Sequence, residues 1–110
     1  MIEWNNEKAA ILAEMFRLMG DHTRLRIVVL ICTRGRVAVG DIAEAIGASP
    51  SLVSHHLRLL RAVRIVKAHR DGRHVYYSPA DKHIERVIED MATHVAEAEG
   101  RPTGEAEIHD

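Results

Sequence analysis

The sequence predicts one small domain that is mainly α-helical and carries a single β-hairpin. Hydrophobic residues make up 46% of the 110 residues but aromatic ones only 4%, which indicates an aliphatic, mainly helical core. Apolar residues recur at helical spacing along most of the chain. The exception surrounds Asp71-Gly72, a dipeptide favoured in two-residue hairpin turns, which is followed by the β-favouring run Val75-Tyr76-Tyr77.

Two helices are expected before residue 36. Apolar residues three and four apart run from 11 to 19, and Gly20 ends that first helix. Asp21 is a good N-cap for the second, because its carboxylate can accept hydrogen bonds from free N–H groups of the first turn. The segment 25–31 is apolar on several faces, which predicts a buried central helix that ends near Arg34-Gly35.

A short helix and a longer one follow. The short helix is expected over 39–46, with Gly47 as its C-terminal stop. Ser49 as N-cap and Pro50 at the first helical position open the longer helix, because both residues are preferred there. The residues expected to face inward from it are Leu52, Val53, Leu57, Leu60 and Val63.

The hairpin is expected to have arms at 65–69 and 73–78. Ser78-Pro79-Ala80-Asp81 resembles a capping box that opens a last helix over 82–99. After Gly100 the chain has no periodicity, so we expect residues 100–110 to be a disordered tail and residues 1–99 to be the single folded domain. The apolar stripe of the last helix consists of Ile84, Val87, Ile88, Met91, Val95 and Ala98.

Helix, short helix, turn, helix and hairpin in this order describe a winged helix-turn-helix. Four segments, in order and with matching separations, resemble the ArsR/SmtB family of metal-responsive repressors. The resemblance covers about residues 10–98 and implies a homodimer that binds operator DNA under the control of a metal ion. The four segments are 21–27 (DHTRLRI), 41–43 (DIA), 51–60 (SLVSHHLRLL) and 71–77 (DGRHVYY).

The net charge of −1 conceals an uneven distribution. Residues 51–78 hold six Lys or Arg and one acidic residue, a charge of +5, whereas residues 79–110 hold three Lys or Arg and nine acidic residues, a charge of −6. Residues 1–50 hold six of each, so the three segments add up to −1. The basic segment is the one that would attract a polyanion such as DNA.

Several classes of protein are not expected. A single domain of this size has little room for a catalytic cleft, and no nucleophile–base pair is apparent, so we do not expect an enzyme. No apolar stretch approaches the roughly 20 residues that span a membrane. The N-terminus lacks a secretory signal, and the lone Cys32 cannot form an internal disulfide, so a cytoplasmic location is expected.

The DNA-reading surface is expected on the helix opened by Pro50 and on the hairpin. Short polar side chains suit base edges, and cations suit phosphates. The resemblance implies base contacts for Ser51, Ser54 and His55, with Arg58 as a base or phosphate contact, and a wing contact for Arg70, Arg73 and His74. A homodimer would read an inverted repeat, with half-sites about one helical turn apart or somewhat more. The alternative is that these residues are only solvated charges, and the orientation of Arg64 and Lys67 is left open.

Four residues of metal-ligand type at the start of the last helix and within it stand out by their spacing: Asp81, His83, His94 and Glu97. The two histidines are eleven positions apart, so they lie on nearly one face but roughly 16 Å apart along the axis. Because Zn–N bonds are only about 2.0–2.1 Å long, ligands at the two ends of one helix cannot bind the same ion. A shared ion requires the same helix of a second chain running antiparallel, and two-fold symmetry would then give two identical sites.

The pattern Asp-x-His, ten residues, His-x-x-Glu also resembles the zinc site on the last helix of this family. The resemblance implies a four-coordinate Zn(II) that favours the form with low DNA affinity, and a hydrogen bond from the second ring nitrogen of His94 to a main-chain carbonyl near Arg64. Co(II) and Ni(II) suit the same ligand types and are alternatives. Cys32 is expected to be a small core residue, and His109 an idle residue of the tail.

A further alternative is a winged-helix dimer without a metal effector. In that case the acidic last helix would serve only dimer or partner contacts. A zinc titration of operator binding distinguishes it from a metal sensor.

Overall fold

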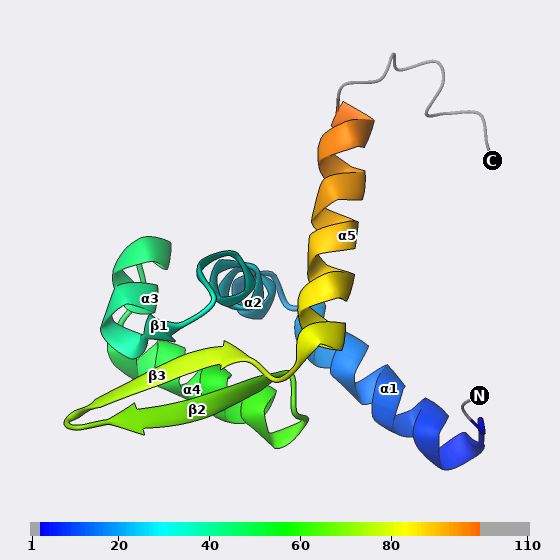
Figure 1. Cartoon of the computed structure of the whole chain (residues 1–110), viewed down its shortest axis with the longest axis horizontal. Coiled ribbons are helices and arrows are strands. Elements are labelled where there is room, and N and C mark those ends of the chain that lie inside the picture. The colour runs from blue at the N-terminus through cyan, green and yellow to red at the C-terminus, as the bar shows by residue number, and fades with distance from the viewer. Residues whose placement is uncertain (1–2, 100–110) are drawn as a thin grey trace.

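The computed structural model describes residues 3–99. The expected winged helix-turn-helix is confirmed, and Figure 1 shows the β-hairpin extending to one side of the helices while the last helix stands out from them. The expected tail at 100–110, including His109, lies outside the described residues. The elements are α1 (Asn6–Met19), α2 (His22–Arg34), β1 (Val37–Ala38), α3 (Val39–Ile46), α4 (Pro50–Ala62), β2 (Val66–Asp71), β3 (His74–Pro79) and α5 (Lys82–Glu99).

Local capping groups fix most helix ends, as the sequence predicted. The Asp21 carboxylate accepts from the Arg24 N–H at 3.0 Å, and the Ser49 hydroxyl accepts from the Leu52 N–H at 3.1 Å. Gly47 adopts the left-handed conformation, with φ of 70°, after α3. These contacts lie within a few residues of each helix end, so the sequence alone was enough to predict them.

The prediction for the start of the last helix was wrong in one detail. Ser78 is not its N-cap, because it lies in β3, where it pairs with Lys67. The capping group is Asp81, whose Oδ1 accepts from the Ile84 N–H at 3.1 Å. Helix α5 therefore begins almost immediately after the last strand of the wing in the chain.

The hairpin turn lies one residue later than expected. Asp71 pairs with His74, so the two turn residues are Gly72 and Arg73 rather than Asp71 and Gly72. Gly72 has φ of 65°, and a glycine with positive φ at the first central position is the requirement of a type II′ turn. Arg73 is therefore at the tip of the wing and not in its second arm.

A third strand was not expected. The two residues of β1 pair antiparallel with β3, Val37 with Tyr77 and Ala38 with Tyr76, which gives the strand order β1-β3-β2. Two residues are too few to show an alternating pattern in the sequence. This short strand attaches the wing to the chain segment between α2 and α3.

The core lies where α2, α3 and α4 meet the base of the wing. It is aliphatic, as the composition predicted, and Ile88 is the one residue of α5 that is buried in it. Leu52 was expected to face inward but is 45% exposed, whereas the next residue, Val53, is fully buried. The fully buried side chains are Ile27, Val28, Ile31, Ile42, Val53, Leu57, Leu60, Ile65 and Val66.

Helices α1 and α5 leave an apolar face uncovered in the protomer. Their side chains meet at a small cavity of about 70 Å³ that includes Leu12, Phe16 and Val87 among its lining residues. Phe16 is 57% exposed and Val87 46% exposed, although both are large and apolar. Every residue of α5 from 91 onward is exposed, and Figure 1 shows this half of the helix extending away from the body. No helix within residues 3–99 is both long and apolar enough to cross a membrane.

Candidate DNA-binding and metal-binding sites

Helix α4 presents a polar face opposite its buried one. Leu57 and Leu60 are fully buried, and they anchor the helix to the core. Of the residues predicted to face bases, Ser51 and His55 are exposed and Ser54 is half-buried. The residues Ser51, Ser54 and Arg58 follow one another at steps of three and four, so they form a continuous stripe along one side of the helix.

The wing presents its predicted basic residues to solvent. Arg70, Arg73 and His74 are all exposed, with Arg73 at the turn. They lie at the end of the hairpin that is farthest from α5 in Figure 1. The wing and the polar face of α4 therefore supply two separate groups of cations and hydrogen-bonding side chains.

Arg36 braces the wing, a role that the sequence did not reveal. Its guanidinium lies 4.4 Å from the centre of the Tyr76 ring and 3.5 Å from the Asp71 carboxylate. One cation from the loop before β1 therefore contacts both strands of the hairpin near its tip. A cation–π contact and an exposed ion pair are each worth about 1 kcal/mol or less. Because Arg36 and Asp71 are 35 residues apart, no local pattern predicts the contact.

A second connection missed from the sequence joins α4 to α2. The Arg24 guanidinium donates to the Leu18 carbonyl at 2.7 Å and lies 3.5 Å from the His56 ring. Burial, followed by the nearby Arg24 charge, lowers the pKa of His56. The neutral form of the His56 ring is thus favoured, and the ring packs against α2, whereas its neighbour His55 faces solvent.

The structure brings two of the four predicted metal ligands together. Asp81 and His83, at the start of α5, lie with Oδ1 and Nδ1 3.7 Å apart. His94 and Glu97 are exposed near the other end of the same helix. Within residues 3–99, no group of three or more His, Cys, Asp or Glu side chains is placed to hold a metal ion in one protomer.

The donor set nevertheless fits a transition metal such as zinc. Two imidazoles and two carboxylates are ligands that Zn(II) accepts in a four-coordinate site. Oδ1 of Asp81 is engaged by the Ile84 N–H, which orients the carboxylate and leaves Oδ2 as the oxygen that could bind a metal. The His83 side chain is 90% exposed, so no part of the protomer hinders its approach to an ion.

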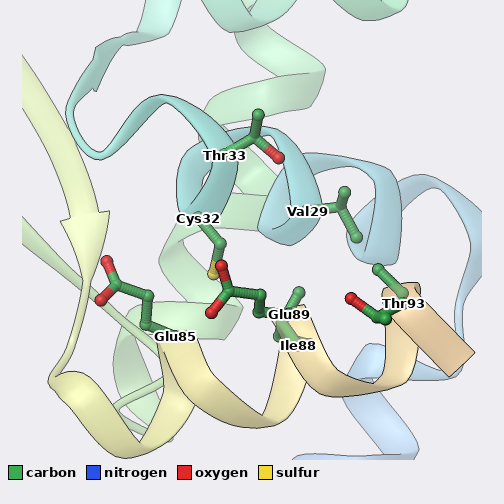
Figure 2. Close-up of a pocket in the computed structure, with 8 residues that line it drawn as sticks. Val29, Cys32, Thr33, Glu85, Ile88, Glu89 and Thr93 are labelled. Carbon is green, nitrogen blue, oxygen red and sulfur yellow. The ribbon is translucent and has the colours of Figure 1, made fainter.

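Cys32 lines a cavity of about 350 Å³ between α2 and α5. It is half-buried rather than fully within the core, and Figure 2 shows the Glu89 carboxylate directed toward its sulfur with Glu85 nearby. Burial, followed by the charges of Glu85 and Glu89, raises the pKa of the Cys32 thiol to about 11. The environment is therefore the opposite of the electropositive one that activates a thiol.

We expect Cys32 to react slowly with iodoacetamide in the folded protein. With a pKa of about 11 instead of 9.0, its thiolate fraction at pH 8 is about a hundredfold smaller. Alkylation followed by mass spectrometry should be at least tenfold slower at pH 8 in the folded protein than in urea, and should accelerate as the pH rises toward 11. Equal rates in the two states would contradict this assignment.

The sequence is similar to those of known bacterial transcriptional regulators. The family described as "Bacterial regulatory protein, arsR family" matches residues 21–68, which run from the start of α2 to the first half of β2. A transcriptional repressor SmtB homolog of Synechocystis sp. is 41% identical over 93 residues, 84% of this chain and 70% of that protein. A cadmium resistance transcriptional regulatory protein CadC homolog of Staphylococcus aureus is 36% identical over 85 residues, 77% of this chain and 70% of that one.

A solved structure shares the whole architecture. The homodimeric winged helix-turn-helix DNA-binding domain of a possible ArsR-family regulator from Mycobacterium bovis superposes with a TM-score of 0.74. It is 28% identical, and the match covers 92% of this chain and 94% of that one.

Proposed function

Because the chain belongs to the ArsR/SmtB family of bacterial transcriptional regulators, we propose that it is a homodimeric metal sensor that leaves its operator when Zn(II) binds. Family membership makes the protein a DNA-binding transcriptional repressor and not an enzyme. The proposal adds the metal, the sites between subunits and the direction of the response. It places the function in one domain, residues 1–99, in the cytoplasm.

The placement of the four candidate ligands carries the proposal. Asp81 and His83 are adjacent at one end of α5, and His94 and Glu97 are exposed at the other end. One protomer offers two half-sites and completes neither. A second copy with its α5 antiparallel would bring the Asp81 and His83 end of each chain to the His94 and Glu97 end of the other. This would complete two sites.

The uncovered apolar face supports the same dimer. Val87, Met91 and Val95 recur every four residues along α5 and are 46%, 59% and 57% exposed. Exposed apolar stripes of this kind mark protein contacts. The dimer in the Mycobacterium bovis domain supports two-fold assembly here.

The polar stripe of α4 and the wing would then contact DNA. Two copies of α4 would enter successive major grooves of an inverted repeat. Ser51, Ser54 and His55 would read base edges, and Arg58 would reach a base or a phosphate. Arg70, Arg73 and His74 would hold the neighbouring backbone or minor groove.

Bound Zn(II) would supply only a fixed connection between the two last helices. Occupied sites can change DNA affinity only if they favour one dimer arrangement over another. We propose that they favour the arrangement with low DNA affinity. The coupling is reciprocal, so DNA must weaken zinc binding by the same factor as zinc weakens DNA binding, typically about 5- to 150-fold.

The proposal is tested by titrating the native protein with Zn(II) while the anisotropy of a labelled operator is followed. The operator is first selected from a pool of random duplexes, and Mg(II) serves as the control ion. Zn(II) should weaken operator binding at least about fivefold, and Mg(II) should not. Unchanged affinity with Zn(II) would reject the zinc sensor, and release by Co(II) or Ni(II) alone would reassign the metal.

Arg73→Ala and Ser54→Ala should affect DNA binding in different ways. Arg73 is at the exposed tip of the wing, so its loss should weaken binding to all duplexes and reduce the salt dependence by about one phosphate contact. Ser54→Ala should weaken operator binding by about 1 kcal/mol or more and leave binding to random duplexes nearly unchanged. Affinities at several salt concentrations measure both effects. Identical losses on operator and random DNA for Ser54→Ala would contradict its role in base reading.

A further inference from the structure

A basic hollow lies where α4, the wing and α5 meet. We use this term for the cavity of about 370 Å³ whose charged lining residues are Arg61, Arg64, Lys67 and Asp81. Among residues 3–99, none of these three cations belongs to an ion pair. The hollow therefore carries a formal surplus of two positive charges, and no ion pair within residues 3–99 balances it.

The backbone brings these cations together. Arg64 has φ of 62°, the only positive value at a non-glycine residue within 3–99, and it turns the chain sharply after α4. Its N–H donates to the Arg61 carbonyl at 3.0 Å, which closes the turn. The Ala80 N–H donates to the Ile65 carbonyl at 3.0 Å, so the start of α5 is held against the same turn. Asp81 consequently forms one wall of the hollow.

We propose that the acidic end of the partner subunit's α5 occupies the basic hollow and forms an ionic contact across the dimer interface. The register of this contact rests on the proposed function, in which Glu97 of one chain meets Asp81 of the other. In an antiparallel pair, residue numbers rise along one helix in the direction in which they fall along the other. Glu99, two residues beyond Glu97, therefore lies past Asp81 of the facing chain, on the side of Pro79 and the end of β3, which precede its α5. The strand register links that position to the hollow, because Pro79 pairs with Val66 and Ser78 pairs with Lys67.

The direction of Glu99 agrees with this placement. Val87, Met91, Val95 and Glu99 are four residues apart in succession, so they lie along one stripe of α5. The first three are the exposed apolar residues that a partner would cover. The stripe thus ends in a carboxylate, and the last turn of α5 contains no basic residue that would neutralise it.

The apolar contacts of α5 favour the partner helix over DNA as the occupant. The hollow contains Asp81, and it adjoins the carbonyl end of α4, where the helix dipole is negative. Both would repel a phosphate. A partner carboxylate would be subject to the same repulsion, but it is brought to the hollow by the apolar contacts of its own helix. Its entry therefore does not depend on charge alone.

A charge-exchange experiment tests the contact. The dimer dissociation constant of metal-free protein is measured by analytical ultracentrifugation for Lys67→Glu, Glu99→Lys and the double variant. Each single reversal should weaken the dimer about fivefold at low salt, and the double variant should return to within about twofold of the native value. About 1 M salt should remove most of the difference. Arg34→Glu, at an exposed cation on α2 away from the hollow, is the matched control and should leave dissociation unchanged.

Three results would overturn the proposal. The single reversals could leave dissociation unchanged, or the double variant could be at least as weak as the two single ones together. Alternatively, Lys67→Glu could leave the dimer dissociation constant unchanged and reduce the salt dependence of operator binding. That result would show that the hollow binds DNA. Because all dimer measurements are made without metal, zinc-driven release in the native protein can still hold when this contact fails.

Discussion

His94→Ala should bind operator DNA as tightly as the native protein and should no longer be released by Zn(II). His94 is exposed in the last third of α5, a different helix from α4, so its loss should not affect base or phosphate contacts. Removing one of the four protein ligands leaves the fourth position to water, so the ion would connect the two helices less firmly. The weakening of operator binding by Zn(II), about fivefold or more in the native protein, should fall to below about twofold. His22→Ala, at an exposed histidine on α2, is the control and should retain the full response.

Mixed dimers make the test specific for sites between subunits. One variant lacks Asp81 and His83, and the other lacks His94 and Glu97, so neither homodimer has an intact site. In a heterodimer, one site lacks all four ligands and the other retains all four. Mixing the two inactive variants should therefore restore tight zinc binding to about one site per heterodimer. If the mixture binds no better than its components, the ligands do not lie across the interface.

Leu57→Ala should destabilise the protein by about 3 kcal/mol, within the range of about 2–5 kcal/mol for buried leucines. Leu57 is fully buried, and it fixes α4 to the core beneath the reading face. Leu52→Ala is the matched control on the same helix, because Leu52 is 45% exposed and its truncation should cost less than about 1 kcal/mol.

Urea unfolding at one fixed protein concentration measures both variants. A typical domain is stable by only about 5–15 kcal/mol, so Leu57→Ala should lower the denaturation midpoint substantially. Similar midpoints for the two variants would show that the packing around α4 differs from that described above.

The elements that depend on neighbouring residues were predictable from the sequence. Asp21 and Ser49 cap helices through residues only three positions away, and the turn type near Gly72 follows from one glycine. The turn was nevertheless placed one residue early, because Asp-Gly and Gly-Arg can both form a two-residue turn. Only the pairing of the whole hairpin, from Asp71 with His74 to Val66 with Pro79, decides between them.

Features that depend on distant residues were not predictable. Arg36 reaches Asp71 and Tyr76, and Arg24 reaches His56, only after the chain has folded. The candidate metal ligands were identified from residue type and spacing. The structure adds that Asp81 and His83 are neighbours.

In the proposed dimer, the partner covers the apolar face left open by α1 and α5, so the abundance of the protein would be a determinant of its stability. A chain whose last helix has only one residue in its own core gains cohesion from association, and association follows mass action. The melting temperature should therefore rise by several degrees between nanomolar and micromolar protein, and calorimetric or fluorescence melts over that range would measure it. A cell that makes few copies would hold a more easily unfolded and more readily degraded protein, so synthesis rate and lifetime would be linked before any metal is bound.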